Sequence, residues 1–79
     1  MNYLPQLGTH LRQARKQHFS GDGLSAFALR LGVSRATLQK MEKGDLSVTM
    51  GKYYRAAEVL GLIDGFDQLL KPERSLFDD

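Results

Sequence analysis

One short stretch of the chain carries side chains suited to hydrogen bonding with the edges of nucleic acid bases. Arg35, Ala36, Gln39, Lys40 and Lys43 follow one another at spacings that leave them on one side of a helix. Arginine and glutamine make paired hydrogen bonds to guanine and adenine, and an alanine can contact the methyl group of thymine. These residue types in this order predict a helix that reads double-stranded DNA.

The neighbouring residues fix the direction in which this helix faces. A lone lysine or arginine is usually ordinary surface charge. Here Ser34 is suited to cap the helix, since its hydroxyl can accept from a backbone N–H three residues on. Val33 and Leu38 have the spacing of a hydrophobic staple across the same helix start. Leu38 and Met41 must then face inward, which leaves the polar side chains outward.

Five helical segments are expected to position these side chains, and the predicted fold class is all-α. Apolar residues recur every three or four positions, and no alternating run of β-branched residues predicts a strand. Pro5 suits a first helical turn, whereas Gly32 and Gly61 suit helix ends. Of the adjacent Tyr53 and Tyr54, only one can face the core. The first expected helix carries the apolar stripe from Leu4 to Ala14, has His10 and His18 on its surface, and is broken by the turn at 20–23. The other expected segments cover about 24–31, 35–43, 50–60 and 63–70.

The arrangement of these segments carries a family resemblance. Two short amphipathic helices joined by a tight glycine turn form a helix-turn-helix, whose second helix enters the major groove. The chain resembles the Cro/repressor-type helix-turn-helix proteins, or XRE family, over about 7–70. The matching residues are Leu11-Arg12-x-x-Arg15, Phe27-Ala28, Leu31-Gly32-Val33-Ser34, Leu38, Glu42-x-Gly44, and Met50 to Leu60 followed by Gly61.

The resemblance implies a compact five-helix, lambda-repressor-like domain that binds operator DNA as a symmetric dimer. It places Arg35, Ala36 and Lys40 at base-reading positions, with Gln39 adjacent. Phosphate contacts are expected at Ser34, Lys43, Thr49 and Lys52. The start of a helix at Thr49 also offers free N–H groups and a positive dipole end, which suit a phosphate. Arg15 and Glu42 match a structural ion pair that ties the first helix to the end of the third.

One segment departs from the family pattern. The family usually has a short turn between its first two helices, followed by a Thr/Ser-Gln pair whose glutamine commonly reaches DNA. Here the chain reads FSGDGLSAFA, about two residues longer, with Leu24 where that glutamine belongs. That contact is expected to be missing, unless backbone N–H groups of 21–23 replace it. Asp22 would repel DNA mildly unless it caps the following helix.

Composition narrows the class of protein further. The 79 residues suit one domain, expected over 1–70, with a short mobile tail over 71–79. There is no cysteine and only two histidines, so we expect no metal and no cofactor. No apolar run could span a bilayer and no secretory signal opens the chain, so we expect a cytoplasmic protein. So small a helical domain leaves little room for a catalytic pocket, and we do not expect an enzyme.

Charge and the apolar C-terminal end suggest the partners. The residues up to Ala57 carry a net charge of +6, and those from Glu58 onward carry −4. The basic part suits a polyanion. We expect a transcriptional regulator, a repressor acting as a homodimer through Phe66, Leu69 and Leu70. The alternative is an antitoxin that also binds a toxin protein through these residues together with Leu76 and Phe77.

Overall fold

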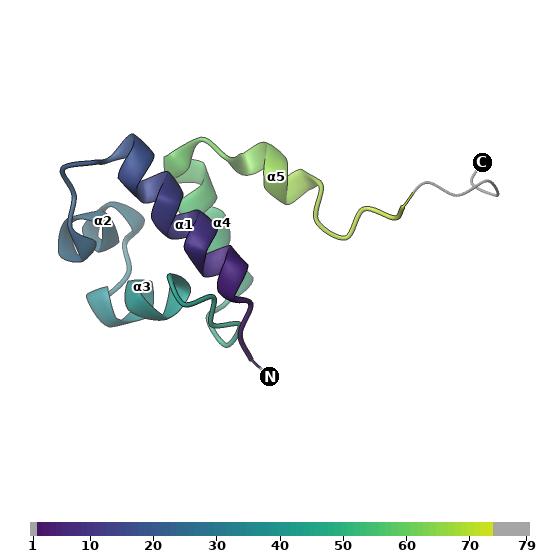
Figure 1. Cartoon of the computed structure of the whole chain (residues 1–79), viewed down its shortest axis with the longest axis horizontal. Helices are drawn as coiled ribbons and strands as arrows, with labels where there is room; N and C mark the ends of the chain where they lie inside the picture. Colours follow the sequence, from purple (N-terminus) through teal and green to yellow (C-terminus); the bar gives the residue numbers. More distant parts are fainter. Residues whose placement is uncertain (1, 74–79) are drawn as a thin grey trace.

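The computed structural model describes residues 2–73, and these form five helices in chain order (Figure 1). The helices are α1 (Pro5–His18), α2 (Leu24–Leu31), α3 (Arg35–Met41), α4 (Met50–Leu60) and α5 (Ile63–Asp67). No strand occurs among the described residues, where a single isolated bridge pairs Tyr3 with Asp45. The predicted all-α class is confirmed.

The core lies where α1, α2, α3 and α4 meet. Phe27, Leu38 and Met41 are its largest fully buried side chains. Their spacing within α2 and α3 brings one apolar stripe of each helix against the others. The remaining buried apolar residues of this cluster are Leu11, Ala14, Ala28, Leu31, Tyr53, Ala56 and Leu60.

The chain ahead of α1 is joined to the loop between α3 and α4. The amide of Leu4 donates to the Gly44 carbonyl at 2.7 Å, and the amide of Leu46 donates to the backbone carbonyl of Asn2 at 2.6 Å. Gly8 and Gly44 permit this approach, since a Cβ at either position would overlap backbone atoms of the opposing segment. Gly44 also has a φ of +76°, a left-handed conformation that glycine adopts without steric cost. The start of α1 and the end of α3 are thereby held together.

Two helices end earlier than the sequence pattern indicates. α3 ends at Met41 rather than Lys43 because the amides of Lys43 and Gly44 bond three residues back, to Lys40 and Met41, as a tightening turn. α5 ends at Asp67 rather than Leu70, and Leu70 itself has a φ of +59°. A left-handed residue cannot continue a right-handed helix.

Leu4 and Met50 have the helical spacing of core residues, with Leu7 and with Tyr53 and Ala57 respectively, but both lie outside the core. Leu4 is 50% exposed and Met50 is 64% exposed. Both line an open apolar groove beside α5 instead of packing under another helix.

The segment 61–73, here called the α5 arm, projects from the four-helix body (Figure 1). α5 contains no buried residue. Phe66 anchors the arm to α4 by an edge-to-face contact with Tyr54, with ring centroids 5.4 Å apart. No helix among the described residues is both long and apolar enough to cross a membrane. Residues 74–79, which include Leu76 and Phe77, lie outside the described part, so the expected tail is not tested.

Candidate nucleic-acid interface

The turn between α2 and α3 aims the predicted reading helix outward. Gly32 takes a φ of +72° and ends α2, as its sequence context predicts. The Ser34 hydroxyl then accepts from the amide of Thr37 at 3.0 Å, which confirms the predicted cap. Leu38 and Met41 are fully buried on the inner side of α3. These contacts leave α3 little freedom to rotate about its own axis.

The side chains expected to read bases lie on the outer side of α3. Arg35, Ala36, Gln39 and Lys40 are all exposed. Among the described residues, no side-chain hydrogen bond or ion pair engages Arg35 or Gln39. Their hydrogen-bonding groups are therefore available to a partner.

The side chains expected to contact phosphate border this face. Ser34 precedes α3, Lys43 follows it, and Thr49 and Lys52 stand at the start of α4; all four are exposed. Thr49 occupies the N-cap position of α4, as predicted, but its side chain makes no capping hydrogen bond. The first N–H groups of α4 thus lack a side-chain acceptor and can donate to a bound anion.

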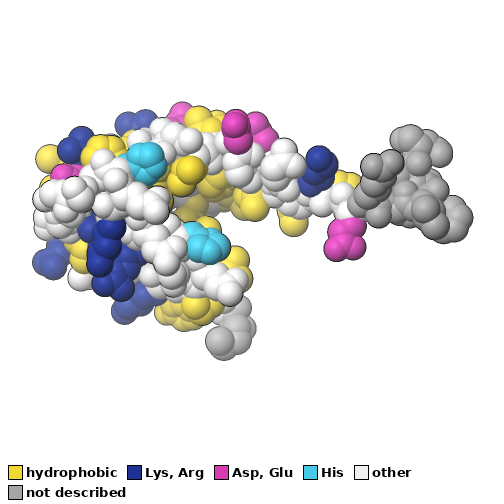
Figure 2. Space-filling view, turned by 45° about the horizontal axis from the view of Figure 1, so that its top comes forward, with side chains coloured by type: hydrophobic (Ala, Val, Ile, Leu, Met, Phe, Trp, Pro, Cys, Tyr) yellow, Lys and Arg dark blue, Asp and Glu magenta, His cyan; other side chains and the backbone are white. Residues whose placement is uncertain are grey.

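Charge is unevenly distributed over the molecule. Figure 2 shows Lys and Arg side chains gathered over the helical body, whereas the acidic side chains visible in that view lie mostly toward the arm. A polyanion is therefore attracted to the body and repelled by the arm.

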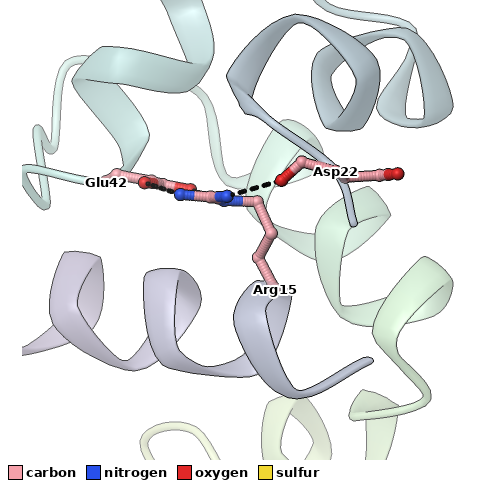
Figure 3. Close-up of polar contacts among 3 residues, drawn as sticks. All are labelled: Arg15, Asp22 and Glu42. Atoms are coloured by element: carbon pink, nitrogen blue, oxygen red, sulfur yellow. Dashed lines mark hydrogen bonds and ion pairs between the residues drawn. The ribbon is translucent and has the colours of Figure 1, made fainter. Parts of the chain in front are cut away.

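An ion pair joins α1 to the end of α3 (Figure 3). Arg15 donates to both carboxylate oxygens of Glu42, at 2.7 and 3.2 Å, and both side chains are 9% exposed. Arg15 also donates to the carbonyl of Asp22 at 3.0 Å. The hydrogen bond to Glu42 raises the pKa of Arg15, and burial opposes it more weakly. Arg15 thus has a structural position, below the exposed face.

The long turn between α1 and α2 is held by contacts that the sequence pattern does not reveal. Arg30 donates to both carboxylate oxygens of Asp22, at 2.6 and 3.4 Å, and the hydrogen bond raises the pKa of Arg30. The same guanidinium lies 4.2 Å above the ring of Phe19, which in turn packs against Phe27. Asp22 does not cap α2, because Gly23 occupies that position without a side-chain bond. Pairing with Arg30 offsets the charge of Asp22 instead.

The loop between α3 and α4 is fixed from below by a tyrosine. Tyr53 is buried and donates its hydroxyl to the Asp45 carbonyl at 2.7 Å, and burial raises the pKa of the phenol. The Asp45 carboxylate accepts from the hydroxyl and the amide of Ser47, which lowers its pKa. Of the two adjacent tyrosines, Tyr53 is therefore the core residue. Tyr54 is partly exposed, and its ring packs edge-on against Phe66.

A second exposed surface lies on the other side of the body. An open groove of about 500 Å³, with almost wholly apolar walls, runs between α1, α4 and the arm. Phe66 and Leu69 line this groove, whereas Leu70 stands beside it, 95% exposed. The groove and Leu70 form an apolar surface without a covering element among the described residues.

The fold and the exposed face of α3 together define a DNA-binding domain of the helix-turn-helix class. A family model described as a helix-turn-helix domain matches residues 6–68, so the chain belongs to this family. It is also 44% identical over 66 residues to a protein of Pyrococcus abyssi named as a candidate HTH-type transcriptional regulatory protein. The match covers 82% of this chain but 18% of that relative. No solved structure matches the chain significantly.

Proposed function

We propose that this chain binds double-stranded DNA sequence-specifically and regulates transcription. The observation that carries the proposal is the outward face of α3, where Arg35 and Gln39 are exposed and without a described partner. The relative named as a transcriptional regulator supports the regulatory role.

In this proposal α3 enters the major groove with its first turn leading. Arg35 makes paired hydrogen bonds to guanine, Gln39 pairs with adenine, Ala36 contacts a thymine methyl group, and Lys40 bonds to a base acceptor. Phosphate contacts set the register and the salt sensitivity without reading sequence. The residues proposed for them are Ser34, Lys43, Thr49 and Lys52, grouped around the start and end of α3 and the start of α4.

We further propose that the regulator acts as a homodimer on a near-palindromic operator and represses by occluding the promoter. The supporting feature is that one chain carries both an open apolar groove and the exposed side chains of Leu69 and Leu70 on the arm. The apolar arm of one copy can therefore pack against the apolar groove of another. The acidic arm of one copy is also complementary in charge to the basic body of another. Half-sites are expected about 34 Å apart, one turn of DNA.

Selection of bound sequences from random duplex DNA tests binding, symmetry and spacing together. The expected result is a consensus with two inverted half-sites. Absence of any enriched sequence would contradict the proposal. Sedimentation of the purified chain, alone and with the selected duplex, tests the dimer. Co-purification of a second, different protein from the native host, with monomeric chain in solution, would favour the antitoxin alternative.

A further inference from the structure

A histidine stands in the wall of the apolar groove between α1, α4 and the α5 arm. His10 lies three residues after Leu7 and four before Ala14 on α1, a spacing that places it on the apolar side of this helix. Its side chain lines the groove together with Leu7 and Leu11 and is exposed. Within residues 2–73 the imidazole makes no side-chain hydrogen bond or ion pair.

No other group that lines the groove changes its charge near neutral pH. Among residues 2–73, no lysine, arginine, aspartate or glutamate side chain forms its walls. Tyr53 does line the groove, but burial raises the pKa of its phenol, and the hydroxyl is bonded to the Asp45 carbonyl. Histidine is the residue type whose charge ordinarily changes between pH 5 and 8. The charge of the groove lining in this range therefore depends on His10.

Charged side chains adjoin the lining residues along the chain without lining the groove. They are Arg12 on α1, Asp45 in the loop before α4, Lys52, Arg55 and Glu58 on α4, and Asp64 and Asp67 on the arm. Asp45 is bonded to Ser47, and Glu58 pairs with Arg55. The walls from α1 and α4 thus keep a positive surplus, whereas the arm supplies carboxylates, so the arm of a second copy is attracted to this side of the body.

We propose that the α5 arm of a second copy covers His10 when the homodimer forms, so that the dimer requires a neutral His10 and dissociates on acidification. The inference rests on the proposed homodimer and adds a control of its assembly by pH. Leu70 of the arm is 95% exposed and gives it an apolar side chain with which to cover the imidazole. Loss of water from the ring costs far more for the charged imidazolium than for the neutral form.

Acidification should therefore favour the monomer. The free chain binds a proton at His10, whereas the dimer excludes it, so the dimer is strongest above the range in which histidine titrates and is lost as the pH falls through it. A two-fold dimer contains this contact twice. Exclusion of one proton from each of two imidazoles weakens the dimer by about 100-fold between about pH 7.5 and 5.5. Carboxylates ordinarily stay ionised over that interval, so the charge of the arm is constant.

Sedimentation equilibrium of the full chain at about pH 7.5, 6.5 and 5.5 measures the dimer dissociation constant without DNA. Wild type should show the weakening, and so should the matched control His18→Gln, because His18 is exposed at the end of α1 and does not line the groove. His10→Gln should dimerise equally at all three pH values. His10→Lys, which stays charged throughout, should resemble the acidified wild type already at about pH 7.5.

Two results would overturn the inference and leave the homodimer standing. One is a wild-type dimer whose dissociation constant is unchanged, or lower, at acidic pH, since the second case would place a carboxylate of the partner beside His10. The other is a pH dependence that persists in His10→Gln. A chain that is monomeric at every pH would overturn the homodimer together with the inference, whereas selection from random duplexes still decides DNA binding. Thermal unfolding equal to that of the wild type excludes a folding defect in each variant.

Discussion

The helix-turn-helix unit (residues 24–44) and the α5 arm are built in opposite ways. In the unit, seven-residue α3 buries Leu38 and Met41 completely and is tied at both ends by Ser34 and Glu42. In the arm, five-residue α5 buries nothing and leaves Leu70 95% exposed. Short helices are not stable by themselves, so each needs tertiary contacts. Packing therefore fixes the orientation of the outer face of the unit, whereas the arm leaves apolar side chains that no described residue covers.

The largest expected effect comes from the core side of α3. Leu38→Ala should lower the free energy of unfolding by about 2–5 kcal/mol, because it leaves a cavity in a fully buried site. Leu70→Ala should change the stability of the monomer by less than about 0.5 kcal/mol. Urea unfolding at low protein concentration measures both variants. If Leu38→Ala and Leu70→Ala lowered the free energy of unfolding by similar amounts, the proposed difference in packing between the unit and the arm would be wrong.

The tie between α1 and α3 should rank next. Glu42→Gln should destabilise the fold by about 2–3 kcal/mol, because Arg15 would keep its charge at a site where only 9% of the side chain is exposed. Thermal or urea unfolding measures the loss. Glu58→Gln is the control, since Glu58 pairs with Arg55 at 3.6 Å on an exposed surface, where ion pairs contribute little. An equal effect of both changes would show that the Arg15 pair is no stronger than a surface pair.

The outer side of α3 should affect binding without affecting folding. Arg35→Ala should cost about 1–3 kcal/mol of operator affinity and relax the preference at one base pair per half-site. Lys52→Ala should weaken specific and non-specific duplexes alike and flatten the salt dependence. Titrations with operator and scrambled duplexes at several salt concentrations separate the two roles. Equal weakening on both duplexes by Arg35→Ala would make Arg35 a phosphate contact.

The smallest expected effect concerns pH and the loop behind α3. Hydrogen bonds from Ser47 lower the pKa of Asp45 in the folded chain. Above about pH 5 the carboxylate is ionised in both folded and unfolded chains, and its contribution to stability is complete. As the pH falls further, the unfolded chain binds the proton first, and this contribution is lost on passing through the lower folded pKa. Asp45→Asn should remove that part of the acid sensitivity, measured as the urea midpoint between pH 5 and about pH 2. A wild-type acid profile in Asp45→Asn would assign the sensitivity to other carboxylates.

The sequence predicts the helix-turn-helix unit better than its surroundings, for a physical reason. Ser34, Gly32 and the apolar period act within one or two helical turns, so local rules identify the cap, the turn and the buried side of α3. Whether Met50 is buried depends instead on whether another helix packs over it. The apolar period places Met50 on the inner side of its helix but does not predict which helix, if any, covers it.

Contacts between distant loop residues were also beyond the sequence. The sequence suggests that Asp22 repels DNA unless it caps α2, yet Asp22 pairs with Arg30, the penultimate residue of that helix. Arg12 follows Leu11 in a recognisable motif, but its place beside Lys43 depends on how α1 crosses the end of α3. Such neighbours are set by helix packing, which no short motif encodes.

The backbone contact at Gly8 and Gly44 limits which substitutions the sequence can accept during evolution. Even a methyl group at either position would collide with the main chain opposite, so no other amino acid preserves the junction. Gly21 and Gly51 face open space at negative φ and are free to change. In proteins derived from this sequence, Gly8 and Gly44 should therefore stay glycine, whereas the residues on the outer side of α3 can change without altering how α1 and α3 are joined.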